Sequence, residues 1–237
     1  MKLKILLSAI LVFLIAGTGL PQYIPLNYNL NPGKSLNKTS STSSIVNNSI
    51  NDVITSGDTV WLATSQGLSL STDNGNTWKN FSGDALFGTE SISAIGYDKY
   101  NGVFWAATAH SITQDNQSIP VGSGLKYTTD NGNTWASIPQ PVDQQSDSVV
   151  VYGQNRLKAL PITVTPQNII YDMTFTPGTI WIASFSAGIR KSTDMGKTWQ
   201  RVVLPPDYLD SVSPSDTLNF CFSPVSGNFC GEANLNF

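Results

Sequence analysis

Carboxylate pairs are the residues of this 237-residue chain whose chemistry could support hydrolysis. Glycoside hydrolases set two carboxyl groups beside the scissile bond, one to donate a proton and one to attack or to activate water. The chain has only two glutamates, Glu90 and Glu232. Three aspartates, Asp52, Asp98 and Asp172, fall near the predicted inner strands. Nothing in their spacing separates them from ordinary loop carboxylates, so no catalytic residue is predicted.

Motifs for other chemistries are missing from the sequence. There is no glycine-rich phosphate loop, no CxxC and no HExxH. The single histidine, His110, has no matching serine or cysteine motif and is expected to be a solvated loop residue. Two cysteines cannot supply a four-thiolate zinc site. The sequence therefore predicts neither a metal site nor a cofactor.

One octet, in contrast, occurs three times: STDNGNTW at 71–78, TTDNGNTW at 128–135 and STDMGKTW at 192–199. The aspartates are 57 residues apart (73 to 130) and then 64 residues apart (130 to 194), a spacing typical of a repeated structural unit. The octets share an aspartate, a glycine, a threonine and a tryptophan in phase: Asp73, Asp130 and Asp194; Gly75, Gly132 and Gly196; Thr77, Thr134 and Thr198; Trp78, Trp135 and Trp199.

The residue types of the octet indicate a structural turn. The glycines fall where a tight turn needs positive φ, which costs glycine least. An aspartate in a turn accepts hydrogen bonds from backbone amides two or three residues further on. The tryptophans begin the outgoing strand and offer a large apolar area for packing between sheets. A calcium loop is the weaker interpretation, because the octet lacks the alternating acidic positions and terminal glutamate of an EF-hand.

Each octet is the third turn of a four-strand pattern. A tryptophan-containing apolar run precedes it: VWLAT at 60–64, FWAAT at 104–108 and IWIAS at 180–184. Short apolar runs separated by turn residues predict strands at 50–54, 59–64, 68–71 and 77–81; at 91–97, 103–109, 124–128 and 134–138; and at 169–176, 179–184, 188–192 and 198–203. Residues 111–123 and 139–168 are expected to form loops. The pattern predicts an all-β fold of about three four-stranded antiparallel β-propeller blades.

The octets resemble the Asp-box, S/T-x-D-x-G-x-T-W, of sialidases, sortilin-type receptors and other secreted propellers. The resemblance covers about residues 50–203 and implies that each box is a hairpin loop at the blade periphery, away from the ligand face. Sialidase activity would further imply three arginines around a substrate carboxylate, a Tyr–Glu pair and an acidic aspartate. The chain has only Arg156, Arg190 and Arg201, none before the first box, and the last two are expected on an exposed strand face. The resemblance therefore implies the fold without the activity.

The bulk composition limits the possible partners. Charged residues make up 12% of the chain and the net charge is −3, so no basic surface for nucleic acid is predicted. Tyr97, Tyr100, Tyr127 and Tyr152 could line a face that stacks on a sugar or peptide, and the alternative is that most of them are ordinary sheet residues.

The N-terminus has the order of a secretory signal. Two lysines precede the apolar segment 5–16, which is too short to span a membrane that needs about 20 residues. The predicted organisation is a signal peptide at 1–19, a flexible leader at 20–49, three blades at 50–203 and an irregular tail or further blade at 204–237. In an oxidising compartment Cys221 and Cys230 are expected either to form a disulfide or to remain as two buried thiols.

The sequence thus predicts a secreted, non-enzymatic binding or scaffold module for a glycan or protein ligand. Three blades leave two sheet faces uncovered, so further blades in a longer chain are expected. The alternative is a fragment of a sialidase-like glycoside hydrolase whose catalytic residues lie outside this chain.

Overall fold

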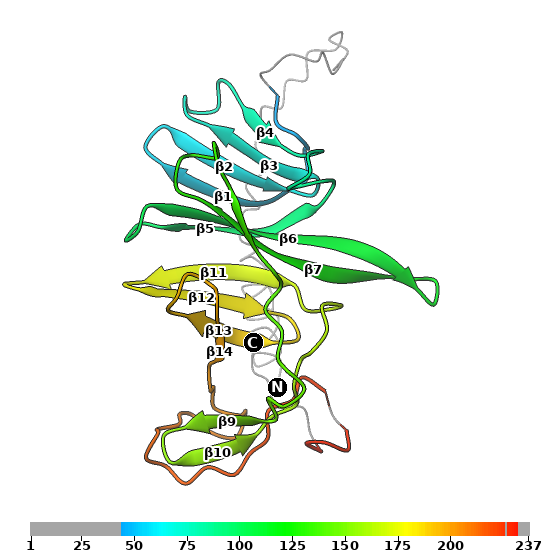
Figure 1. Ribbon diagram of the computed structural model, residues 1–237, viewed down its shortest axis with the longest axis vertical. Coiled ribbons are helices and arrows are strands. Elements are labelled where there is room, and N and C mark those ends of the chain that lie inside the picture. Colours follow the sequence, from blue (N-terminus) through cyan, green and yellow to red (C-terminus); the bar gives the residue numbers. More distant parts are fainter. Residues whose placement is uncertain (1–43, 226, 232–237) are drawn as a thin grey trace, which may run out of the picture. The chain divides into compact units, whose positions relative to one another are not determined.

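The computed structural model describes residues 44–225 and 227–231 (Figure 1). The predicted signal peptide, residues 20–43 of the leader, and Glu232 lie outside the described residues. Within the described ranges the chain is all-β, and no helix in them has the length and apolarity needed to cross a bilayer.

Three four-stranded sheets follow one another along the chain, and in each the strands pair antiparallel with their sequence neighbours (Figure 1). Blade 1 contains β1 (Ile50–Ser56), β2 (Thr59–Thr64), β3 (Gly67–Ser71) and β4 (Lys79–Phe81). Blade 2 contains β5 (Ser91–Asp98), β6 (Val103–Gln114), β7 (Gln117–Thr128) and β8 (Ala136–Ile138). Blade 3 contains β11 (Ile170–Thr176), β12 (Thr179–Ser184), β13 (Gly188–Ser192) and β14 (Gln200–Arg201).

The blades bury apolar faces that no single sheet could cover. Between blades 1 and 2, the Trp61 ring stacks on Phe104 with the ring centroids 3.8 Å apart, and Ile92 is fully buried beside them. Between blades 2 and 3, Trp105 and Ile182 lie in a second buried cluster. Burying an isoleucine side chain contributes about 1.5–3 kcal/mol. Consecutive four-stranded meanders stacked in this way are blades of a β-propeller.

The first strand of every blade has a β-bulge at the same position. The pairing register shifts between Ile50 and Asp52 in β1, between Ile92 and Ala94 in β5, and between Ile170 and Asp172 in β11. A bulge inserts one unpaired residue and changes the direction of its side chain. The inserted residues are Asn51, Ser93 and Tyr171.

The loop predicted at 111–123 is wrong. Instead β6 and β7 continue their pairing to Gln114 and Gln117, with Ile112 opposite Ile119. The reversal is a two-residue turn at Asp115 and Asn116, whose φ angles are 51° and 61°. Asp and Asn tolerate this left-handed conformation, and a turn with positive φ at both residues matches the twist of a hairpin. The polar composition of the segment concealed this hairpin.

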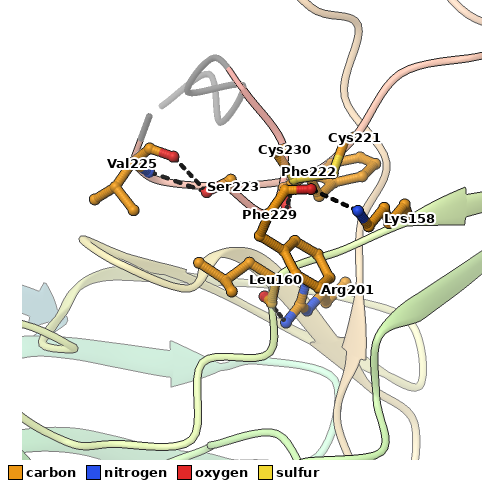
Figure 2. Close-up of a disulfide and its surroundings, with 9 residues drawn as sticks. All are labelled: Lys158, Leu160, Arg201, Cys221, Phe222, Ser223, Val225, Phe229 and Cys230. Carbon is orange, nitrogen blue, oxygen red and sulfur yellow. Dashed lines mark hydrogen bonds between the residues drawn. A yellow bond between two sulfur atoms is a disulfide. The ribbon is translucent and has the colours of Figure 1, made fainter. Parts of the chain in front are cut away.

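The segment 139–168 is also more ordered than predicted. It contains the hairpin of β9 (Val149–Tyr152) and β10 (Asn155–Lys158), which packs on Phe222 of the tail. Cys221 and Cys230 are joined by a disulfide in this tail. Figure 2 shows the nearby Lys158, whose Nζ donates to the Phe229 carbonyl at 2.6 Å. We call the β9–β10 hairpin together with residues 204–225 and 227–231 the disulfide module.

Candidate functional site

The three octets adopt one geometry. In the first, the Ser71 hydroxyl donates to Asp73 Oδ1 and accepts a hydrogen bond from the Gly75 amide, both at 2.8 Å. The Thr77 amide and hydroxyl both donate to the Asp73 carboxylate, at 2.8 and 2.7 Å. The same four bonds recur in the other octets, where Thr128, Asp130, Gly132 and Thr134, and Ser192, Asp194, Gly196 and Thr198, are the partners.

These bonds hold the octet carboxylates in their ionised form. The amide and hydroxyl of Thr134, together with the Thr128 hydroxyl, lower the pKa of Asp130 to about 2. Thr198 and Ser192 lower the pKa of Asp194 to about 2 in the same way. Each carboxylate is engaged by its own loop, which leaves it poorly suited to exchange protons with a substrate.

The octet glycines have positive φ: 84° at Gly75, 76° at Gly132 and 78° at Gly196. The residue before each glycine is also left-handed, which the sequence patterns did not indicate, with φ of 58° at Asn74 and 61° at Met195. Asparagine tolerates this conformation and methionine does so much less well.

The octets of blades 2 and 3 also contact the preceding blade. A Cβ on Gly132 would lie 2.4 Å from the Phe81 ring at the end of β4. A Cβ on Gly196 would lie 2.6 Å from Ile138 at the end of β8. Trp135 packs edge-on against Phe81 and Phe87, with centroids 5.3 and 5.0 Å apart. Each of these two turns therefore joins its blade to the one before it.

A separate open pocket of about 860 Å³ lies where the three first strands begin. The bulge residues Asn51, Ser93 and Tyr171 all line it, one from each blade. We call this hollow the bulge pocket. Bulges next to binding sites commonly redirect a side chain toward the ligand. The equivalent bulges of three blades converge on this pocket.

A polar cluster stands beside the bulge pocket. His110, which lines the pocket, lies with Nδ1 2.8 Å from the Ser123 hydroxyl and 3.9 Å from Glu90 Oε1. The buried Lys126 has Nζ 3.4 Å from Glu90 Oε2 and 3.1 Å from Thr108 Oγ1. Burial opposes ionisation of Glu90, but hydrogen bonds from Ser123 and Thr108 and the charge of Lys126 outweigh it and lower the pKa of Glu90. His110 lies in β6 and not in a loop, although it is exposed as expected.

The candidate carboxylates do not gather at one site. Asp98 is buried and accepts hydrogen bonds from Tyr100 and Asn101 of its own turn. Asp52 Oδ2 accepts from the Ile95 amide of blade 2 at 3.0 Å, and Asp172 accepts from the amide of Met173. Across residues 44–225 and 227–231, no group of three His, Cys, Asp or Glu side chains is arranged to hold a metal ion.

The expected exposure of Arg190 and Arg201 is wrong. Both are buried or nearly so around Asp143, a residue that no sequence motif marks. Arg190 Nη1 lies 2.7 Å from Asp143 Oδ1, and Arg201 contacts Oδ2. Burial opposes ionisation of Asp143, but the two arginines outweigh it and lower its pKa. The arginines anchor segment 139–148 to blade 3 and are not available to bind a substrate carboxylate.

The candidate tyrosines lie in different places. Tyr97 and Tyr100 are exposed near the β5–β6 turn, whereas Tyr127 packs on Trp105 with centroids 4.6 Å apart. Tyr152 belongs to the disulfide module, where its hydroxyl donates to the Val212 carbonyl. The aromatic residue at the bulge pocket is Tyr171, which is 56% exposed and which the sequence patterns did not indicate.

Two further hollows lie in or beside the disulfide module. One, between Leu160 and Val202, holds about 10 Å³, roughly the minimum for one water molecule. The other, of about 520 Å³, lies beside the disulfide and is lined by Lys158 and Tyr208. The bulge pocket is larger than either and is lined by all three blades.

No protein-family model matches the chain. No curated protein matches it. Among solved structures, an ancestral GH74 enzyme is 20% identical over 71% of this chain and 20% of that chain, with a TM-score of 0.47. YCF48 bound to D1 peptide is 18% identical over 60% of this chain and 36% of that one, with a TM-score of 0.34. The extracellular domain of BT4673 from B. thetaiotaomicron is 13% identical over 62% and 22%, with a TM-score of 0.29. The chain thus spans about a fifth to a third of the length of these proteins.

Proposed function

We propose that the chain is a secreted, non-enzymatic binding module built from Asp-box propeller blades, with the bulge pocket as its ligand-binding surface. The carrying observation is the convergence of Asn51, Ser93 and Tyr171, the bulge residues of three blades, on one pocket. Because the bulge recurs at the same position in each blade, every blade contributes one side chain to the lining of this pocket.

The chemistry of the pocket wall favours a neutral glycan over a charged ligand. Its polar groups are hydroxyls, an amide and an imidazole, and Tyr171 offers an exposed ring for stacking against a sugar face. The Glu90 and Lys126 charges beside it are paired with each other. A protein ligand is the other member of the proposed class.

A binding role is further supported by how the carboxylates are used. Asp52 joins blade 1 to blade 2, Asp98 closes a turn, and the octet aspartates hold their own loops. Glycoside hydrolysis requires two carboxyl groups that flank the scissile bond. These aspartates do not form such a pair at the bulge pocket.

Export is supported by the order of charged, apolar and small residues at 1–19 and by the disulfide, which persists in oxidising compartments. We therefore propose an extracellular, periplasmic or cell-surface location.

Binding to a panel of neutral oligosaccharides tests this proposal. Tyr171→Ala is expected to lower the affinity for any oligosaccharide bound by about tenfold or more, because a lost stacking contact of about 1.4 kcal/mol corresponds to tenfold. Tyr208→Ala is the matched control, since Tyr208 is 72% exposed and lies outside the bulge pocket. Equal affinity of the two variants would contradict the pocket assignment. Release of sugar from a fluorogenic glycoside would instead favour the hydrolase alternative.

A further inference from the structure

Each contact between blades is made by two different faces. The face that meets the next blade, here called the second face, contains a tryptophan, an alanine and a leucine at matching positions: Trp61, Ala63 and Leu68 in blade 1 and Trp105, Ala107 and Leu125 in blade 2. All six are nearly fully buried, with at most 4% exposure. The face that meets the preceding blade, here called the first face, contains Ile92 and Ile95 in blade 2 and Ile170 and Met173 in blade 3.

The second face of blade 3 has a tryptophan, an alanine and an isoleucine in place of the leucine, and none of the sheets formed by the described residues stacks on it. Ala183 pairs with Ile189 across β12 and β13 as Ala63 pairs with Leu68 across β2 and β3. Trp181, Ala183 and Ile189 are only half-buried. They line an open hollow of about 250 Å³.

The first face of blade 1 is the missing complement. Ile50 and Val53 hold the positions of Ile92 and Ile95, because the bulge stands between the members of each pair. Ile50 is 43% exposed and Val53 is 54% exposed, whereas Ile92 and Ile95 are 0% and 2% exposed. The first octet also lacks a contact with a preceding blade. A Cβ on Gly75 would contact only Trp78 of the same octet.

We propose that the first face of blade 1 binds the second face of blade 3 of a second copy of this chain. Each copy carries both halves of a contact that the molecule already makes twice, so the interface between copies continues the established stacking. Two copies joined at both ends would form a ring that contains six four-stranded sheets, counting the three that the described residues of each copy form. A head-to-tail contact forms a ring when its rotation closes, and closed propellers contain about 4–8 blades.

Asp172 is a polar residue on the open second face of blade 3. It holds the position of Asp52, directly after the bulge. Asp52 Oδ2 accepts a hydrogen bond from the Ile95 amide of the next blade at 3.0 Å. The residue of blade 1 that corresponds to Ile95 is Val53. The Val53 amide, however, already donates to Asp52 Oδ1 of its own chain at 2.8 Å, so the apolar side chains and not this amide carry the proposed contact.

Sedimentation velocity of the purified chain tests the proposal. The wild-type chain is expected to sediment as a dimer. Ala183→Glu and Val53→Glu each place a carboxylate on one of the two faces and are expected to give monomers, with the dissociation constant raised at least 100-fold. Val151→Glu is the matched control, because Val151 is 63% exposed in the β9–β10 hairpin and lies on neither face. This control is expected to remain dimeric.

Mixing the two variants distinguishes head-to-tail binding from pairing of like faces. Val53→Glu keeps an intact blade 3 and Ala183→Glu keeps an intact blade 1, so their mixture is expected to form a heterodimer through one intact contact. A wild-type chain that is monomeric at all concentrations would overturn the proposal. So would variants that stay dimeric, or a mixture that stays monomeric. Circular dichroism of each variant confirms that the sheets remain folded.

Discussion

At the scale of single residues, the octet aspartate acts as a hydrogen-bond centre for its own turn. The Asp130 carboxylate accepts from the amides of Asn133 and Thr134 and from the hydroxyls of Thr134 and Thr128. Charge-assisted bonds of this kind are stronger than bonds between neutral groups. The shared aspartate therefore has a structural explanation that needs no substrate.

The octet carboxylates should make the free energy of unfolding depend on pH in the acidic range. The pKa of Asp130 and of Asp194 is about 2 in the folded chain, below the value of about 3.9 for an unfolded aspartate. Their stabilising contribution is therefore fully present above about pH 4 and is lost as the pH falls toward about 2. Between pH 5 and pH 2.5 the denaturation midpoint of the wild-type chain is expected to fall. We expect a smaller fall for Asp130→Asn.

Asp115→Asn, in the β6–β7 turn outside the octets, serves as the comparison for this acid titration. If both variants showed the same acid dependence as the wild-type chain, the octet carboxylates would not be the groups responsible.

Residue patterns alone could not reveal how Arg190, Arg201 and Asp143 are used. Arg190 and Asp143 lie 47 positions apart in sequence (143 to 190), and no local period links them. Burying one charge requires partners, and only the folded chain brings these three together. Their buried positions show why an arginine next to a repeat is weak evidence for a binding site.

At the scale of elements, the blades are held by contacts between a turn and the preceding outer strand. We expect Gly132→Ala to destabilise the chain through two effects. Positive φ costs an alanine about 1–2 kcal/mol. The added Cβ would also lie 2.4 Å from the Phe81 ring, and such overpacking adds about 1–3 kcal/mol. Urea unfolding monitored by tryptophan fluorescence measures the sum.

Gly57→Ala separates the two effects. Gly57 also has positive φ, 57°, but no atom lies within 4 Å of its Cβ position. This variant is expected to show the backbone cost alone. Equal losses at the two positions would show that the contact between blades adds nothing.

Most strands could be predicted because apolar and turn residues alternate at short range. The predictions for β2, β12 and β13 coincide with the observed Thr59–Thr64, Thr179–Ser184 and Gly188–Ser192. The bulges were missed, because a one-residue register shift appears only when two strands are paired. The extended β6–β7 hairpin was missed because its strands are exposed and polar, which removes the hydrophobic signal.

At the scale of the whole molecule, the disulfide module is a satellite core beside the blades. Its small cluster of Leu157, Ala159 and Phe222 is separate from the two clusters between blades. The bond between Cys221 and Cys230 closes a loop with a sequence separation of 9. Loop closure of this length stabilises by about 2–3 kcal/mol in the chain-entropy model.

We expect the double substitution Cys221→Ser and Cys230→Ser to loosen the disulfide module while the blades stay folded. The Phe222 amide donates to the Lys158 carbonyl, and the Leu160 amide donates to the Phe222 carbonyl. The rate of hydrogen exchange should rise at both amides. Exchange at amides of β2 and β6 is expected to be unchanged. Faster exchange throughout the blades would contradict the separation of the two parts.

The bulge pocket is a feature of the whole molecule, and its location could not be predicted from the sequence. Asn51, Ser93 and Tyr171 are an amide, a hydroxyl and a phenol at unequal spacings, so no motif marks them. Only the repetition of the bulge in three stacked sheets brings them to one pocket. The sequence predicted the repeat, and the folded chain reveals which repeated position faces the open space.

The contact of an octet glycine with the outer strand of the preceding blade is the same at both junctions of the chain, at Phe81 and at Ile138. A gene duplication that copied one such unit of 57 residues would deliver both sides of its own junction together. The inserted sheet would find complementary neighbours at once, without any compensating substitution. Repetition of this junction is therefore consistent with growth of the array by whole units.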